Sequence, residues 1–319
     1  MRGHMRSYSK TEKLVRYVAA IMMVAGMTIV AGLTGDKEII FPEIAALVTG
    51  AWLTDRMPWD VSYGKMFLLM TVSATAGIVI VRLPIPLFIK LVIGILLTAM
   101  LLTVSRTTMS PLVSACILPI LMETESPVYV IAVAVMVAFI IGVRLLLERG
   151  GWIDQNHYVA PEQNWPQIVE RWLLVILSFL VIAMIAVNTY QTFVIAPPLI
   201  VALVEMTNPG NQLKKRSTTL CLLVFLCACC GAIGRGICMM TGISINWIVV
   251  CVILLVFLIM YACRLYFPPA GALAILPFLI RDDRVLLYPV QVVCGCIAFV
   301  LIARVIMGML EHDAPVENM

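Results

Sequence analysis

Two arginines at matching positions are the residues of this chain best placed to do chemistry. Arg106 and Arg264 each stand at the end of a long apolar stretch, shortly before a proline that opens a short apolar stretch. A helix beginning at such a proline has a partly positive N-terminus, and a guanidinium beside it suits a carboxylate or a small oxyanion. A single arginine there is more often an interfacial anchor. Because the pattern occurs twice, we give the two interpretations equal weight.

Glu43 is the third candidate, because it follows Pro42 inside the apolar string IIFPEIAAL. A carboxylate in such a place is costly unless it is paired or reaches water. It would serve as a proton carrier or as the partner of an arginine, so we expect a coupling or gating role. The alternative is an interfacial glutamate favoured by its own helix N-terminus. Glu205, near the end of a corresponding stretch, is expected to be interfacial.

Four short apolar stretches carry these residues, and each has proline near its start. They cover about 39–53, 109–122, 193–206 and 267–280. Proline fits the first turn of a helix and breaks a helix elsewhere, so each stretch is predicted to begin a new helix at membrane depth. Beside Arg106, Arg264 and Glu43, the predicted substrate-binding residues are Ser110, Pro111, Pro197, Pro198, Pro268, Pro269, Ala270 and Gly271. The small residues would admit a ligand to the backbone, although close helix packing explains them equally.

Eight longer stretches have the length of a membrane span, which is about 20 apolar residues. They cover about 14–33, 66–82, 86–104, 128–147, 172–190, 218–240, 244–263 and 286–310. Hydrophobic residues make up 62% of the chain and charged residues 13%, a composition that excludes an ordinary soluble protein. We therefore predict an all-α, polytopic protein of the lipid bilayer, with eight long spans and four short, proline-initiated helices that are broken or re-entrant.

The order of long and short stretches occurs twice, which indicates an internal duplication. Three pairs recur at one offset: Arg106 with Arg264, Pro111 with Pro269, and Pro119 with Pro277. The polar stretch 148–171 is the one sizeable loop, so we predict a repeat over 1–147, a linker over 148–171 and a second repeat over 172–319. Duplicated transporters with broken helices place their substrate sites where the repeats meet.

Basic residues predict how the chain lies in the membrane. They cluster in the N-terminal segment, at both ends of the linker and in the turn 207–217. The positive-inside rule places all three in the cytoplasm if each half crosses six times, with both termini cytoplasmic in the cell membrane. An odd number of crossings would give inverted repeats, and the sequence leaves this choice open.

Other classes of function find no support in the sequence. The chain has no HExxH, GxSxG or phosphate-loop motif, so we expect no enzyme. None of its three histidines lies in a predicted span, and its ten cysteines lie mostly within spans, so we expect no metal and no other cofactor. Nothing favours nucleic acid as a partner.

The short stretches resemble the HPP family of integral membrane proteins, named for a His-Pro-Pro motif in a stretch like LTRTLHPPAGATALI. CRLYFPPAGALAILPF (263–278) is similar to it, with Phe267 in place of the histidine, and SRTTMSPLVSACILPI (105–120) is similar more weakly, with Ser110 there. IAPPLIVALVEMTNPGNQLKKR (195–216) is similar to the family's GASAVLLF helix and polar turn. The resemblance implies two HPP-like domains in tandem and membrane transport, linked in some members to nitrite. The missing histidine in both halves speaks against a histidine-dependent proton step.

These observations predict a permease for a small anionic or polar solute, such as a nitrite-like oxyanion or a carboxylate, with its site between the two halves. Arg264→Ala is then predicted to abolish uptake and to leave membrane insertion intact. An exporter of aromatic acids and a non-transport membrane scaffold or subunit are the alternatives. The sequence is compatible with a homo-oligomer, and it names neither the solute nor the direction of transport.

Overall fold

The computed structural model describes residues 9–161, 163–208 and 213–312, and in this part of the chain the regular structure is helical with no strand. Eight of its helices are long and apolar enough to cross a membrane. They are α1 (Lys10–Thr34), α3 (Tyr63–Val81), α4 (Leu87–Val104), α6 (Pro127–Arg149), α7 (Trp165–Asn188), α9 (Ser217–Thr241), α10 (Ile245–Ala262) and α12 (Tyr288–His312). The predicted all-α, polytopic architecture is confirmed.

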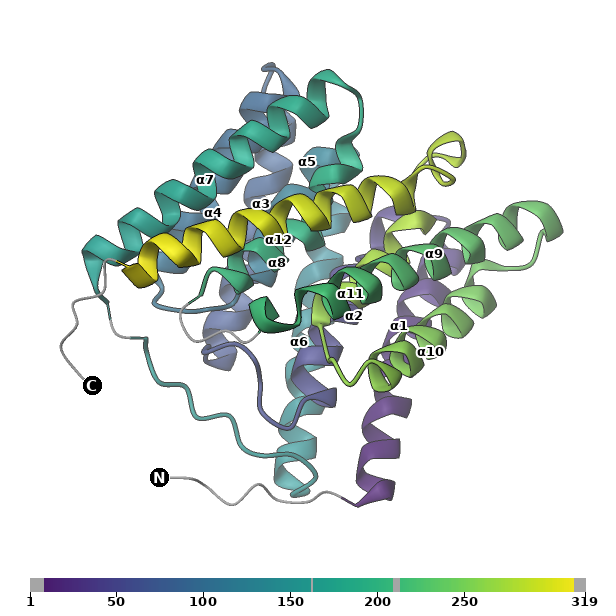
Figure 1. Ribbon diagram of the computed structural model, residues 1–319. Helices are drawn as coiled ribbons and strands as arrows, with labels where there is room; N and C mark the ends of the chain where they lie inside the picture. Colours follow the sequence, from purple (N-terminus) through teal and green to yellow (C-terminus); the bar gives the residue numbers. More distant parts are fainter. Residues whose placement is uncertain (1–8, 162, 209–212, 313–319) are drawn as a thin grey trace.

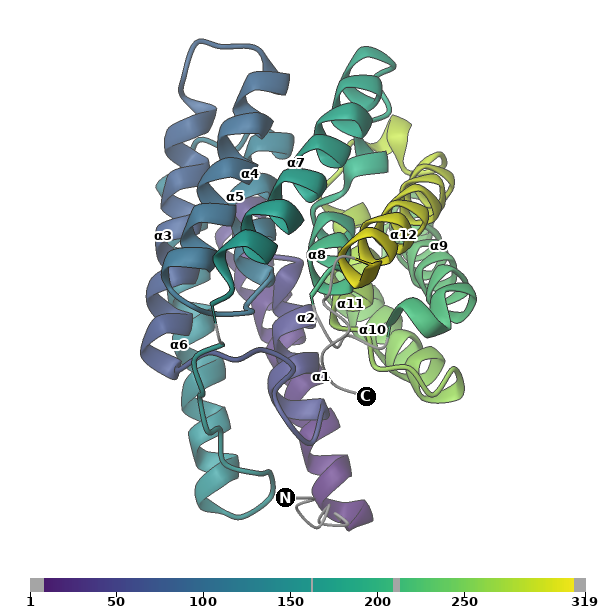
Figure 2. The ribbon, with the colours of Figure 1, turned by 60° about the vertical axis from the view of Figure 1, so that its left-hand side comes forward.

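Four short helices lie in the interior of this bundle (Figure 2). They are α2 (Glu43–Val48), which the π-helix η2 (Thr49–Leu53) continues; α5 (Pro111–Met122); α8 (Pro197–Met206), which the 3-10 helix η3 (Thr192–Ile195) precedes; and α11 (Pro268–Ile275), which η5 (Leu276–Phe278) continues. Proline opens three of them and caps α2. Three further 3-10 turns lie in connections: η1 (Lys37–Ile39), η4 (Leu213–Arg216) and η6 (Asp282–Arg284).

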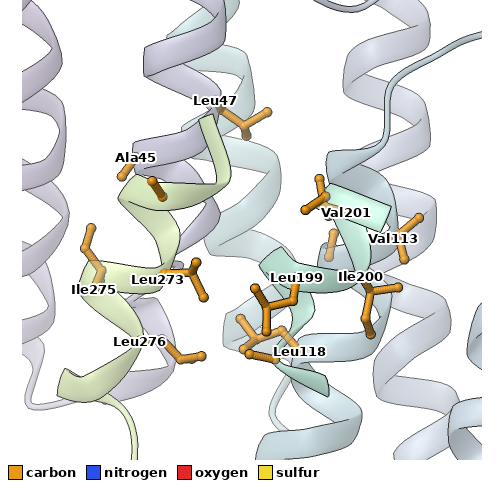
Figure 3. Close-up of a cluster of buried hydrophobic side chains, with 14 of the residues drawn as sticks. Ala45, Leu47, Val113, Leu118, Leu199, Ile200, Val201, Leu273, Ile275 and Leu276 are labelled. Atoms are coloured by element: carbon orange, nitrogen blue, oxygen red, sulfur yellow. The ribbon is translucent and has the colours of Figure 1, made fainter. Parts of the chain in front are cut away.

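The short helices pack against one another across the two halves of the chain. Helix α2 contacts α11, and α5 contacts α8. Figure 3 shows apolar side chains with which they face one another, among them Ala45 of α2, Leu273 of α11 and Leu199 of α8. Nearly every residue of these four helices is buried, because the long helices surround them.

The first long helix of each half packs against the other half. Helix α1 lies along α10, and α7 lies along α4 (Figure 1). The polar segment 148–171 therefore divides the sequence, but it does not mark a boundary between two separately packed domains.

Each half contains a matching hydrogen bond between a long helix and a short helix. The hydroxyl of Tyr129 in α6 donates a hydrogen bond of 3.0 Å to the carbonyl of Ala115 in α5. The hydroxyl of Tyr288 in α12 donates one of 2.7 Å to the carbonyl of Leu273 in α11. The last long helix of each half is thus bonded to the short helix before it: α6 to α5, and α12 to α11. Both hydroxyls are buried and need such a partner.

Two glycines allow matching close approaches of helices. An added Cβ at Gly77 in α3 would lie 2.5 Å from the carbonyl oxygen of Cys116 in α5. An added Cβ at Gly231 in α9 would lie 2.2 Å from the carbonyl oxygen of Ala274 in α11. Both distances are far below van der Waals contact, so only glycine lets these long helices lie directly against the backbone of the short ones.

The segment that joins the halves is fixed at its start by a buried ion pair. Nε of Arg144 lies 2.8 Å from Oε1 of Glu148, and the two side chains are 1% and 9% exposed. The hydroxyl of Tyr63 and the backbone N–H of Asn156 donate to the same oxygen. The Arg144 guanidinium also donates to the carbonyl of Asp154 at 2.7 Å. The start of the linker is thus anchored to the ends of α3 and α6.

Arg144→Leu is expected to destabilise the protein by about 3 kcal/mol, because it leaves the Glu148 carboxylate buried without its cation. The measurement is thermal unfolding of the purified protein in detergent. Arg149→Leu, an exposed change in the last turn of α6, is the matched control. The double variant Arg144→Leu with Glu148→Leu is expected to recover part of the loss. A double variant no more stable than the single one would contradict this explanation.

Candidate functional site

A small cavity lies between the four short helices, mostly at their N-terminal turns. Its volume is about 10 Å³, close to the least that one water molecule needs. Residues from all four short helices and one from the turn before α3 line it: Glu43, Ala46, Trp59, Pro111, Ser114, Pro198, Val201, Glu205, Pro268, Pro269 and Ala272.

Glu43 brings the first carboxyl group to this cavity. It is the first residue of α2 and is 2% exposed. Its Oε1 accepts a hydrogen bond from the hydroxyl of Ser114 in α5. Its Oε2 is buried and has no hydrogen-bond partner among the described residues. A buried carboxyl oxygen without a donor is costly, so this atom marks where a ligand's donor, a water or a proton would be stabilised.

Glu205 brings the second carboxyl group from near the end of α8. Its side chain is buried, with the residue 8% exposed. Oε1 accepts hydrogen bonds from the hydroxyl of Ser110 at 2.7 Å and from the indole Nε1–H of Trp59 at 3.1 Å. The structure thus places Glu205 in the cavity and not at the membrane interface where the sequence suggested it.

Helix α5 links the two carboxyl groups. Ser110 caps its N-terminus and Ser114 lies one helical turn later, so their side chains share one face. Each hydroxyl donates to a different glutamate, one from each half of the chain. Neither partnership is visible in the sequence, because the partners are far apart along the chain. Trp59 was missed for the same reason.

The structure does not bring Arg106 and Arg264 to the cavity. Both side chains are exposed, and both residues adopt the left-handed conformation with φ of 50° and 49°. A single left-handed residue ends α4 and α10 and turns the chain toward the following short helix, which leaves the side chain outside. Their carbonyls accept hydrogen bonds from the Tyr158 hydroxyl and the Arg216 guanidinium, so at these two positions the backbone is what the fold uses.

The first amide groups of the short helices are also occupied. The N–H of Ala270 donates to the carbonyl of Phe267 at 3.0 Å, and the N–H of Leu199 donates to Ala196 at 2.8 Å. Val113 makes the same contact in α5. These backward bonds occupy the N–H groups that were expected to bind an anion. At these positions the helices therefore contribute their dipoles to the cavity rather than free N–H groups.

The other predicted residues separate into two groups. Pro111, Pro198, Pro268 and Pro269 line the cavity with Glu43. Pro197, Ala270 and Gly271 are buried in the same helices but do not line it. At Gly271 an added Cβ would lie 2.9 Å from the Cβ of Ala45, so this glycine serves the packing of α11 against α2.

Arg264→Asn is expected to leave ligand binding and uptake within about twofold of wild type, because the side chain lies outside the cavity. Asparagine suits this position, since it tolerates the left-handed conformation. The measurement is the thermal shift by any solute that stabilises the wild-type protein, followed by uptake of that solute into liposomes. If the variant loses both the thermal shift and the uptake, the Arg264 side chain takes part in binding.

The cavity is acidic. Its lining holds two carboxyl groups and no lysine, arginine or histidine. Such a lining favours a solute with hydrogen-bond donors, and it repels an anion while the carboxyl groups are charged. Within the described residues, no group of three or more histidine, cysteine or acidic side chains is arranged to hold a metal ion.

Comparison of the chain with family models, with curated proteins and with solved structures gives no match. Its function is therefore inferred from the cavity itself.

Proposed function

We propose that this membrane protein is a permease for a small polar solute, and that the solute passes through the cavity between the short helices. One observation carries the proposal. Four buried, short helices, each starting at or just after proline, bring two carboxyl groups to one cavity. Eight apolar helices of membrane-spanning length belong to the same chain. Buried acidic groups at such depth are expensive and mark solute or ion pathways in transporters.

We further propose that the two halves are tandem repeats. The paired tyrosine bonds of α6 and α12 and the paired glycine contacts of α3 and α9 support this. The HPP-like stretches form α5 and α11, whose first prolines line the cavity. Each half thus supplies two short helices to one site, as expected for a transporter whose site lies between repeats.

The acidic lining directs the choice of solute. A neutral solute rich in hydrogen-bond donors, or a small cation, matches the unpartnered Oε2 of Glu43. A nitrite-like oxyanion or a carboxylate would enter only with both carboxyl groups protonated. We therefore place neutral polar solutes and small amines before anions.

Passage requires the helices to move. The cavity of about 10 Å³ holds no solute larger than water, so a larger solute needs the surrounding helices to separate. The contacts between α2 and α11 and between α5 and α8 join the halves at the cavity. Separation of these pairs on one side at a time, by rocking of the halves, would give alternating access.

The charges support cytoplasmic termini in the cell membrane. The N-terminal end of α1 and the C-terminal end of α6 lie at the same end of the molecule (Figure 2). Arg16 and Arg144 are buried near these two helix ends. The positive-inside rule assigns this end to the cytoplasm. Arg2 and Arg6, which belong to the basic N-terminal segment, lie outside the described residues.

The test is a thermal-shift screen of the purified protein against neutral polar solutes, small amines and small anions, followed by uptake into proteoliposomes. A ligand at 100 times its dissociation constant stabilises by about 2.7 kcal/mol, which such a screen detects. Ser110→Ala removes one donor to Glu205 and is expected to weaken binding about tenfold. Uptake by proteoliposomes no faster than by empty liposomes, for every solute in the panel, would contradict the proposal.

A further inference from the structure

The oxygen Oε2 of Glu43 is the feature of the cavity that its protein surroundings leave unexplained. The residue is 2% exposed, the atom is buried, and no described side chain or backbone group donates to it. The other oxygen of the same carboxyl group does have a donor, Ser114. A carboxyl with one bonded and one unpartnered oxygen in apolar surroundings is stable when the second oxygen carries a proton.

The carboxyl group of Glu205 is held by the same helix, α5, that holds Glu43. Ser110 and Ser114 are one turn apart on α5, which is about 5.4 Å along the helix axis. They donate to Glu205 and to Glu43 respectively. Both glutamates line the same cavity, whose volume admits a single water molecule. A water molecule in this cavity would form hydrogen bonds with both carboxyl groups and carry a proton between them.

The lining of the cavity holds no basic side chain that could neutralise Glu43. Helix α2 packs against α1, α5, α6 and α11. The ionisable side chains on which the Glu43 carboxyl group acts include Tyr129 of α6 and Tyr288 of α12, and both hydroxyls already donate to backbone carbonyls. Helix α11 contributes only Pro268, Pro269 and Ala272 to the lining.

Two of the helices that pack against α2 carry buried arginines, and both arginines bind groups outside the cavity. On α1, Arg16 donates to the carbonyl of Leu53 at the far end of η2. On α6, Arg144 pairs with Glu148. The lining therefore supplies no basic side chain to Glu43, and a proton at Oε2 removes the charge of that carboxyl group.

We propose that Glu43 and Glu205 form one proton-exchanging pair, so that the permease moves its solute together with a proton. The inference rests on the proposed function for its transport part. When the cavity opens to one side, the O–H bond at Oε2 of Glu43 breaks and the proton passes to water or to the Glu205 carboxylate. The Glu43 carboxylate keeps the hydrogen bond from Ser114. On the other side the proton returns and the pair regains its starting state.

The test measures the proton directly and needs no solute. Infrared difference spectra of the purified full-length protein, between acidic and alkaline buffer, report the carbonyl band that only protonated carboxyl groups show. We expect the wild-type protein to show this band, and Glu43→Gln to lose the part due to Glu43. Because the two groups interact, the titration midpoint of Glu205 is expected to shift by about one pH unit in the same variant. Glu125→Gln, an exposed change in the turn before α6, is the control for surface carboxyl groups.

Identical spectra for wild type and Glu43→Gln would overturn the proposal, and so would an unchanged midpoint for Glu205. If Glu43→Gln fails to fold, Ser114→Ala takes its place: it keeps the carboxyl group but removes its donor, so the Glu43 band is expected to change frequency, and an unchanged band would overturn the proposal. The permease is tested separately by uptake. If the two carboxyl groups titrate as a pair but no solute is taken up, the proton site stands and the proposed transport function fails.

Discussion

Gly231→Val is expected to destabilise the protein by about 3 kcal/mol or more, because the new side chain would overlap the backbone of a buried helix. The first added carbon alone would lie 2.2 Å from the carbonyl oxygen of Ala274. Neither atom has room to withdraw, since α9 packs along the length of α11 and both belong to the core. The measurement is thermal unfolding of the purified protein in detergent, together with the yield of folded protein.

The same helix supplies a matched control for this effect. Gly236 lies five residues further along α9, and an added Cβ there meets nothing within 4 Å. Gly236→Val changes helix propensity by the same amount, so it isolates the clash. Gly77→Val in α3 tests the corresponding contact with α5 and is expected to behave like Gly231→Val. Equal melting temperatures for Gly231→Val and Gly236→Val would show that the two helices are not in direct contact.

Glu43→Gln is expected to lower proton-driven uptake of the solute at least about tenfold, because glutamine cannot bind and release a proton. Glutamine has nearly the same size and accepts the bond from Ser114, but it carries no exchangeable charge. The measurement is accumulation of the solute identified by thermal shift, in proteoliposomes with an imposed pH gradient.

A second assay separates the coupling of transport to protons from the passage of the solute itself. Exchange of labelled for unlabelled solute at equal pH needs no net movement of protons. We therefore expect Glu43→Gln to retain exchange while it loses accumulation. Ser114→Ala, which keeps the carboxyl group, is expected to reduce accumulation less. Wild-type accumulation by Glu43→Gln would remove this carboxyl group from the mechanism.

The spans and their interruptions were predictable from the sequence, because each depends on local properties. A long apolar run needs a membrane whatever its neighbours are. A proline within such a run starts or ends a helix, so Pro111, Pro197 and Pro268 were expected to open short helices, and the structure has helices beginning at these residues. The recurrence of the same order in both halves is likewise read directly from residue spacing.

The content of the cavity was only partly predictable. Glu43 was found because a carboxylate in an apolar run is an anomaly visible in the sequence. Glu205 lies near the end of its stretch, where an interfacial place was the natural expectation. Arg106 and Arg264 matched an anion site in type and spacing, but the left-handed turn at each residue points the side chain outward.

The sequence by itself determined that the protein has long apolar spans interrupted by short helices, because hydropathy and proline act on the residues next to them. Tertiary structure alone decided which short helices meet, and it brought Ser110 to Glu205 and Ser114 to Glu43. These partners come from different segments, and serine and glutamate form hydrogen bonds equally well with many others. Only the packing of α5 against α8 and α2 selects these two bonds and makes the site acidic.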